Sequence, residues 1–232
     1  QRQMCIRDRR KRVMEHMIKS NIHSTSYLTW WYHSHILGEY PVKKVDVSSL
    51  PNIIKEYFMI DEDYLYFKNR SIEAKHGIMV KQWFTYFKPK TVLDVGCGRG
   101  VHLFFWDMVC DANGLEKSKW AVDNNFVKDK VIYGDITNVK LSKSYDLVCC
   151  IDILEHLKYE ELDQALNNIY NIGKKFLFSI PFIGDPNLNA DKTHVIKETK
   201  EWWISKLKKH NFKIKETPKH FLFRHQMIIA EK

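Results

Sequence analysis

The sequence is poor in glycine and proline and has no long hydrophobic run. It contains 9 glycines and 6 prolines in 232 residues, which excludes a collagen-like or linker-rich chain. No apolar stretch approaches the roughly 18 residues that cross a bilayer, and the basic N-terminus lacks the apolar segment of a secretory signal. We therefore expect a soluble, cytoplasmic protein with no membrane span.

The 5 cysteines form no recognisable framework. There is no C-x-x-C pair, the count is odd, and Cys149 and Cys150 are adjacent. Structural zinc sites and disulfide frameworks use regularly spaced and usually even sets of cysteine. We expect reduced thiols and no metal site.

The composition predicts a packed domain with basic ends. Hydrophobic residues make up 44% of the chain and aromatic residues 13%, enough for a core. The net charge is +9, and residues 1–20 and 192–232 both carry an excess of Lys and Arg. Basic ends attract nucleic acid. No RNP-type aromatic motif or zinc finger accompanies the charge, so nucleic acid is possible but not favoured as a partner.

We predict two parts: an N-terminal helical cap over residues 1–65 and a larger domain over residues 66–232. The segments RVMEHMIKSNI, STSYLTWWYHSHIL and SSLPNIIKEYF within the cap favour helix. The first ten residues, QRQMCIRDRR, do not begin with methionine and resemble adapter-derived sequence. We expect these ten residues to be non-native and leave them out of the fold argument.

The larger domain alternates strands with helices. An amphipathic helix is expected over 72–87, before Pro89. Further helices are expected over 100–109, 118–126, 155–172 and 201–210, and strands over 91–96, 112–117, 130–135, 145–152, 174–182, 212–218 and 224–232. The alternation predicts an α/β fold. In this fold a Rossmann-like, doubly wound, mostly parallel seven-stranded sheet carries a C-terminal antiparallel hairpin strand.

The segment TVLDVGCGRG joins the first of these strands to a helix. Its three glycines are Gly96, Gly98 and Gly100, and a strand, a glycine-rich turn and a helix N-terminus together form a nucleotide-type site. A dinucleotide fingerprint needs a glycine at position 101, where this chain has Val101. Asp94 at the strand end would repel a pyrophosphate, so the ligand is expected to carry positive charge.

VLDVGCGRG resembles the first motif of the class I S-adenosylmethionine-dependent methyltransferases, in particular their small bacterial ubiquinone-biosynthesis-like (type 11) group. The segments GLEKS, YGDIT and YDLVCCIDILEHL match later motifs of that class in order, and the resemblance extends over residues 72–232. It implies S-adenosyl-L-methionine as the cofactor and methyl transfer as the reaction.

The resemblance also implies roles for individual residues. Glu116 would bind both ribose hydroxyls, Asp135 the adenine amino group, and Ile136 would lie beside the adenine ring. The full set that it implies for the cofactor is Asp94, Gly96, Gly98, Gly100, Glu116, Lys117, Asp135, Ile136, Ile151 and Asp152.

Methyl transfer from a sulfonium requires alignment and exclusion of water, and a general base where the acceptor is a hydroxyl. His156 and His194 both follow strands at the edge where ligands gather, so they are the expected catalytic residues. The alternatives are that His156 caps or packs its helix and that His194 anchors its loop. Trp202 and Trp203 are expected to pack in the core or in a lid.

The acceptor is expected to be a small molecule, methylated on O, N or C. The chain has no Asn/Asp-Pro-Pro-aromatic tetrad after the fourth strand, and CCID is not the Pro-Cys arrangement of cytosine-C5 enzymes. Two alternatives stay open: an RNA or protein acceptor, suggested by the basic ends, and a non-catalytic methyltransferase-like module that only binds.

Overall fold

The protein forms one seven-stranded sheet, in a computed structural model that describes residues 72–232. The expected cap over residues 1–65 lies outside the described residues. The strands are β1 (Thr91–Val95), β2 (Asp111–Glu116), β3 (Val131–Tyr133), β4 (Tyr145–Ile151), β5 (Gly173–Ser179), β6 (Lys213–Lys215) and β7 (Met227–Glu231). Their order is β3-β2-β1-β4-β5-β7-β6. Only β7 runs antiparallel to its neighbours, β5 and β6, which confirms the predicted fold class.

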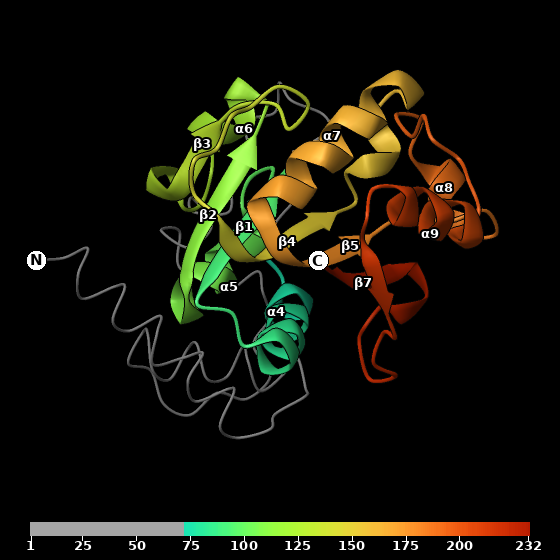
Figure 1. The fold of residues 1–232 in the computed structure, drawn as a ribbon. Coiled ribbons are helices and arrows are strands. Elements are labelled where there is room, and N and C mark those ends of the chain that lie inside the picture. The colour runs from blue at the N-terminus through green and yellow to red at the C-terminus, as the bar shows by residue number, and fades with distance from the viewer. Residues whose placement is uncertain (1–71) are drawn as a thin grey trace, which may run out of the picture.

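Helices cover both faces of this sheet (Figure 1). They are α4 (Ala74–Phe87), α5 (Val101–Val109), α6 (Lys119–Asp123), α7 (Tyr159–Ile172), α8 (Pro186–Ala190) and α9 (Lys200–Lys209). Three 3-10 turns, η2 (Lys128–Lys130), η3 (Leu154–His156) and η4 (Arg224–Gln226), complete the described elements. Over residues 72–232, none of the helices combines the length and apolarity that crossing a bilayer requires.

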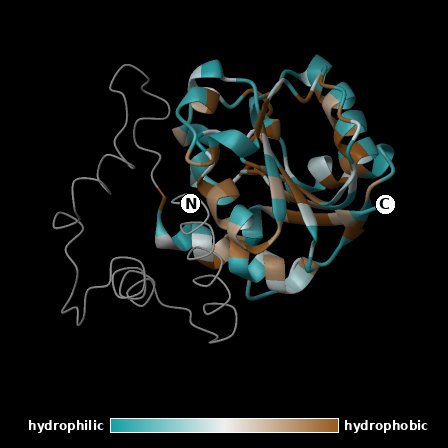
Figure 2. Ribbon diagram, turned by 90° about the vertical axis from the view of Figure 1, so that its left-hand side faces the viewer, coloured by the Kyte–Doolittle hydropathy of each residue, from teal (hydrophilic) through white to brown (hydrophobic). Residues whose placement is uncertain are grey.

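Two hydrophobic clusters pack against opposite faces of the sheet. Alternate residues of a strand point to opposite faces, and in β4 Leu147 and Cys149 join the cluster beneath α4 and α5, while Val148 and Cys150 join that beneath α7 and α9. In Figure 2 the helices around the sheet carry both hydrophilic and hydrophobic residues, as expected for helices that pack on a sheet by one side. Both cysteines are fully buried free thiols, as expected for strand residues.

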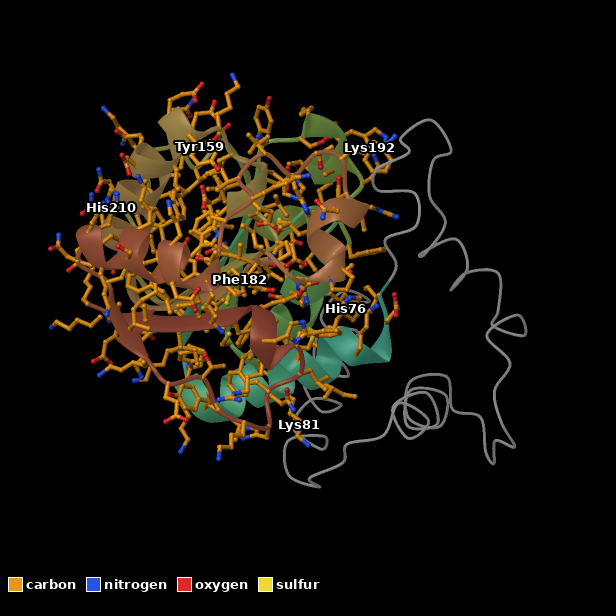
Figure 3. All side chains as sticks on the ribbon, turned by 90° about the vertical axis from the view of Figure 1, so that its right-hand side faces the viewer. His76, Lys81, Tyr159, Phe182, Lys192 and His210 are labelled. Atoms are coloured by element: carbon orange, nitrogen blue, oxygen red, sulfur yellow. The ribbon has the colours of Figure 1, made fainter. Side chains whose placement is uncertain are left out.

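Helices α7 and α9 pack side by side on one face, where Figure 3 labels Tyr159 and His210. His210 Nε2 lies 2.7 Å from Asp163 Oδ1 and so links the two helices. Trp203 is fully buried in the core and Trp202 packs against its edge. This pairing confirms the packing role expected for the two tryptophans.

Some element boundaries differ from the prediction. The helix predicted from residue 155 begins at Tyr159, because Leu157 is buried with an extended backbone and separates η3 from α7. Helix α6 ends at Asp123 rather than 126, since the side chain of Asn125 turns back to the carbonyl of Gly98. Helix α8, capped by Asp185, lies between β5 and α9, where no helix was predicted.

Candidate active site

The loops that follow β1, β2, β3 and β4 meet at the carboxyl edge of the sheet and enclose a cavity of about 410 Å³. Ten residues predicted from the sequence line it: Asp94, Gly96, Gly98, Glu116, Lys117, Asp135, Ile136, Ile151, Asp152 and His156. Gly100 and His194, also predicted, do not line the cavity. The structure therefore brings together side chains spread over more than sixty positions of the chain.

The glycine turn after β1 is built from left-handed backbone. Gly96, Gly98 and Gly100 have φ of 65°, 54° and 82°, a region that side chains disfavour. A Cβ on Gly96 would collide with the side chain of Ile153, and one on Gly100 with Asn125. Gly100 therefore packs within the turn and does not line the cavity, whereas the resemblance places it among the cofactor-binding residues.

Glu116, at the end of β2, is held by two backbone groups. Its Oε1 accepts a hydrogen bond from the Ser118 N–H at 2.7 Å and its Oε2 accepts one from the Gly98 N–H at 2.8 Å. The side chain is only 6% exposed. Each carboxylate oxygen keeps a further lone pair, so the two oxygens can accept from the vicinal hydroxyls of a ribose.

Asp94 is the most unusual carboxyl of the cavity. It is 2% exposed, and its Oδ2 is buried with no hydrogen-bond partner among the described residues. Burial first, and then the charge of Glu116, raise the pKa of Asp94 to about 7, against a hydrogen bond from the Leu103 backbone that lowers it. An acceptor oxygen held in this way fits a cationic ligand.

Asp135 and Ile136 follow β3. Asp135 Oδ1 accepts hydrogen bonds from both the N–H and the hydroxyl of Thr137, each at 2.9 Å. The carbonyl of Ile136 accepts a hydrogen bond from the side chain of Asn168 in α7 at 2.7 Å. The Ile136 side chain is buried. These bonds fix a carboxylate and an apolar surface side by side, a pairing suited to an amino-substituted aromatic ring.

The end of β4 contributes Ile151 and Asp152. Asp152 has a positive φ of 55°, an uncommon backbone state for a residue with a side chain. It is held there by two bonds to Ser179: its N–H donates to the Ser179 carbonyl and its Oδ1 accepts from the Ser179 hydroxyl, both at 2.9 Å. The strained backbone directs this segment along the cavity wall.

His156, in η3, is oriented by a chain of hydrogen bonds. Its Nδ1 lies 2.9 Å from Thr193 Oγ1, which in turn lies 2.6 Å from Asp191 Oδ1. The single hydroxyl hydrogen of Thr193 goes to the carboxylate, so Nδ1 of a neutral His156 donates and its lone pair is on Nε2. Burial of Asp191 acts to raise its pKa, but the bonds from Thr193 and the nearby histidines outweigh it and lower the pKa.

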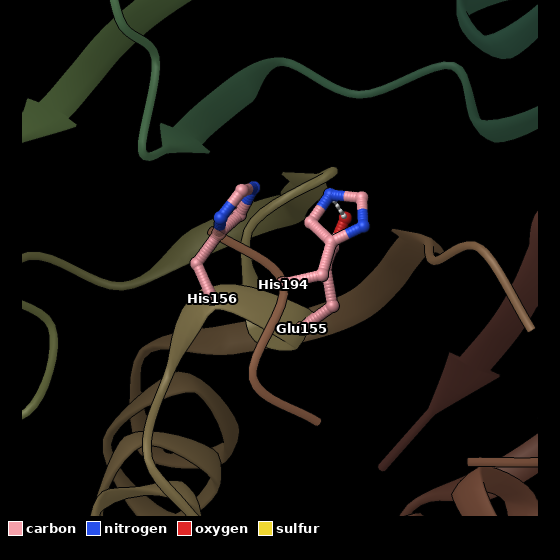
Figure 4. Close-up of side chains that lie close together, drawn as sticks. All are labelled: Glu155, His156 and His194. Carbon is pink, nitrogen blue, oxygen red and sulfur yellow. Dashed lines mark ion pairs between the residues drawn. The ribbon is translucent and has the colours of Figure 1, made fainter. Parts of the chain in front are cut away.

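His194 lies beside His156, as Figure 4 shows, with the two ring centroids 4.7 Å apart. Its Nδ1 contacts the Leu188 carbonyl at 2.9 Å and its Nε2 lies 3.9 Å from Glu155 Oε1. His194 is 9% exposed. It therefore does not reach the cavity directly, and any part it has in the chemistry runs through its neighbours.

Several lining residues were not predicted from the sequence: Val95, Cys97, Arg99, Val101, His102, Leu115, Ser118, Gly134, Ile153, Leu157 and Thr193. Most of them adjoin a predicted residue at a strand end, and Ser118 also caps α6, which is a readable signal. No sequence signal indicated Leu157 and Thr193, because their positions depend on the turn η3 and on the contact between η3 and the loop after α8.

The residues present fit the cofactor that the sequence implies. Asp94, Glu116, Asp135 and Asp152 all line the cavity. This donor set suits a ligand with an ammonium group, a sulfonium and ribose hydroxyls, and is unsuited to a pyrophosphate. The cavity volume lies within the range of sites for small molecules.

Comparisons with known proteins agree with this geometry. A family model described as a methyltransferase domain matches residues 69–218, more than half of the chain. A curated relative, (S)-tetrahydroprotoberberine N-methyltransferase of Eschscholzia californica, is 27% identical over 129 residues, which cover 39% of this chain and 36% of that protein. The match thus spans about a third of the relative's length.

Solved structures share the fold at low identity. A SAM-dependent methyltransferase from Archaeoglobus fulgidus superposes with a TM-score of 0.58 at 21% identity, over 74% of this chain and all of the other. The glycopeptide N-methyltransferase MtfA, in complex with (S)-adenosyl-L-methionine, superposes with a TM-score of 0.52 at 15% identity, over 67% of this chain and 85% of the other.

Proposed function

Because the chain belongs to the class I S-adenosylmethionine-dependent methyltransferases, with S-adenosylmethionine as the cofactor, we propose that it transfers a methyl group to a small molecule. The observation that carries this proposal is the cavity itself. Residues from four separate strand ends line one space at the carboxyl edge, with carboxylates along one part and His156 along another.

The carboxylates form the cofactor half. Glu116 accepts from the ribose hydroxyls, Asp135 and Ile136 hold the adenine, and Asp94 faces the ammonium group of the amino-acid end. Lys117, Ile151 and Asp152 complete the wall. When bound there, the cofactor supplies an activated methyl group, and the protein contributes its orientation and the exclusion of water.

His156 and Thr193 form the acceptor half. The lone pair of a neutral His156 is on Nε2, so this ring is suited to take a proton from an acceptor hydroxyl or ammonium group. The fixed hydrogen bond to Thr193 holds the ring in one orientation. His194 supports His156 from behind.

The acceptor class is tested with a labelled methyl donor. The full chain is incubated with the donor and, separately, with small-molecule, RNA and protein fractions of a cell extract. We expect label in the small-molecule fraction. Label confined to RNA or protein contradicts the proposed acceptor, and donor binding without transfer to any fraction favours a binding module.

A further inference from the structure

We propose that Glu155, His156 and His194 bind a divalent cation of the zinc(II) class, which holds the hydroxyl oxygen of the acceptor beside the cofactor. This inference rests on the proposed function and deepens it, because it names the acceptor group. The expectation from the sequence was that no metal site is present, since His194 lies 38 positions after His156 and the chain has no regular ligand spacing.

The three side chains converge on one small volume. One possible ligand atom from each lies within 4.8 Å of the others, and Figure 4 shows the three side chains grouped between η3 and the loop of His194. Ligand atoms around one tetrahedral zinc ion are about 3.4 Å apart at bond lengths near 2.1 Å. Metal binding therefore requires side-chain rotations that draw the ligand atoms from within 4.8 Å of one another to that spacing.

Both imidazoles are held in the tautomer that a metal needs. His194 Nδ1 faces the Leu188 carbonyl, which can only accept, so Nδ1 is the donor and the lone pair of the neutral ring is on Nε2. His156 Nδ1 faces Thr193 in the same way. A second hydrogen bond that fixes the other ring nitrogen is typical of metal-binding histidines.

The contact between Glu155 and His194 is too long for a hydrogen bond. Glu155 Oε1 and His194 Nε2 are 3.9 Å apart, beyond the usual limit near 3.2 Å. Glu155 is fully buried, and a buried carboxylate is stabilised by nearby positive charge. A divalent cation bound between the two groups adds positive charge beside this carboxylate.

The backbone holds the two halves of the cluster together. The Glu155 carbonyl accepts hydrogen bonds from the N–H groups of Val195 and Ile196, at 2.8 and 2.9 Å. The loop that carries His194 is thereby fixed against the turn that carries Glu155 and His156. Preorganised ligands of this kind reduce the entropy lost on metal binding.

The cluster opens toward the cofactor. His156 and Thr193 line the cavity, whereas Glu155 and His194 lie behind. Two histidines and one glutamate leave a tetrahedral ion with one position for a further oxygen ligand. That position faces the cavity, where a hydroxyl of the acceptor can occupy it.

In this reaction the cation takes the place of the protein base. With Nε2 of His156 bound to the ion, His156 is a ligand and no longer accepts the proton, the role it has when no metal is bound. The acceptor hydroxyl binds the cation through oxygen and loses its proton to solvent, because a cation lowers the pKa of a bound hydroxyl. The oxygen forms a bond to the methyl carbon, and the carbon–sulfur bond breaks with its electron pair passing to sulfur. The products are the methyl ether and a neutral thioether.

Metal binding is measured on the full, tag-free chain. After treatment with a chelator and dialysis, the protein is titrated with zinc(II) and, separately, with cobalt(II). We expect one ion per chain, a rise in melting temperature with zinc, and the visible absorption of tetrahedral cobalt. Glu155→Gln and His194→Gln should each weaken binding at least tenfold, whereas His220→Gln, an exposed histidine that packs on Phe221, should not.

Thr193→Val tests the tautomer argument, since it removes the acceptor of His156 Nδ1 while keeping the side-chain volume. We expect about tenfold weaker zinc binding. Binding of fewer than one ion in ten chains, or equal binding by the Glu155→Gln and parent proteins, overturns the proposal.

Transfer assays separate this inference from the proposed function. A chelated protein that still methylates a hydroxyl acceptor at the full rate overturns the metal site and leaves the methyltransferase standing. A chain that binds zinc as expected but methylates no small molecule overturns the proposed acceptor and leaves the metal site standing.

Discussion

The two halves of the cavity are built in different ways. The cofactor half consists of carboxylates and glycines at or just after the ends of β1, β2 and β3. Hydrogen bonds from backbone N–H groups hold the carboxylates of Glu116 and Asp135. The acceptor half consists of His156 in η3 and Thr193 in the long segment after β5. The Thr193 hydroxyl holds His156, and the Leu188 carbonyl holds His194, which packs against His156 outside the cavity.

This difference separates the binding of the methyl donor, a general function, from the choice of acceptor, a particular one. Short loops at strand ends leave little freedom, so the cofactor half is set by the sheet itself. A long segment such as residues 180–199 can place different side chains over the same cofactor. Substitutions in the cofactor half should therefore change donor affinity, and substitutions in the acceptor half should change turnover or acceptor choice.

The largest effect is expected for Gly96→Val. The side chain would meet Ile153 at a positive φ, so the turn must shift and donor affinity should fall at least a hundredfold by calorimetry. Gly184→Ala is the control for backbone strain. Gly184 also has a positive φ, of 97°, but no atom within 4 Å would meet an added Cβ. Equal affinity of both variants would show that the turn does not contact the donor.

Donor binding should depend on pH through Asp94. With a pKa of about 7 in the free protein, the carboxylate that faces the donor's ammonium group is lost as pH falls through 7, so affinity should fall about tenfold per pH unit below it. Calorimetry from pH 5.5 to 8.5 measures this slope. In Asp94→Asn the affinity should be low and the slope absent, and a wild-type slope in that variant contradicts the assignment.

The same group should make the free protein less stable at high pH. Its pKa is raised from 3.8 on folding, so the folded state binds more protons and stability declines as pH rises from about 4 to 7. At pH 8 the buried, ionised Asp94 lowers the free energy of unfolding by about 4 kcal/mol at most. Asp94→Asn should therefore unfold at higher denaturant concentration than the parent at pH 8, and at nearly the same concentration at pH 4.

Glu116→Gln should weaken donor binding by about ten- to thirtyfold, the loss of charge-assisted bonds to the ribose. The side-chain amide nitrogen of the glutamine cannot accept a hydrogen bond, so the bond from either the Gly98 or the Ser118 N–H is also lost. Part of the loss in affinity therefore comes from a less well-held turn. Glu216→Gln, at an exposed position, is the control. Turnover at saturating donor should change less than affinity, and the reverse would place Glu116 on the acceptor side.

The smallest effect is expected for Asn125→Ala. Its amide donates to the Gly98 carbonyl and accepts from the Val127 N–H, both at 2.8 Å, so it supports the turn without lining the cavity. We expect a three- to tenfold loss of donor affinity, with acceptor turnover unchanged at saturating donor. An unchanged affinity would show that the turn keeps its shape without this support.

The sequence predicted the cofactor half better than the acceptor half. Asp94, Glu116 and Asp135 end consecutive parallel strands, and the topology alone places such residues at one edge. The position of His194 depends on α8 and on two backbone hydrogen bonds to the Glu155 carbonyl. No hydrophobic periodicity or capping motif in the sequence indicates that this segment contacts η3. Its separation from the cavity could not be inferred from its place after β5.

The start of α7 shows the same limit. A helical pattern over 155–172 is present, but burial of Leu157 in the core required an extended residue there and left Glu155 and His156 in a separate turn. Competition between local propensity and core packing is decided by neighbours that are distant in sequence. The pattern predicted the helix and missed the turn in which Glu155 and His156 lie.

Strand β7 lies between β5 and β6 although it follows both in the chain. During synthesis β6 therefore has no partner on the sheet until residues up to Glu231 have left the ribosome. Until then β5 presents an unpaired edge, a surface prone to association with other chains. A nascent chain stalled before β7 should consequently depend on chaperones, even though every residue that lines the cavity has already been made.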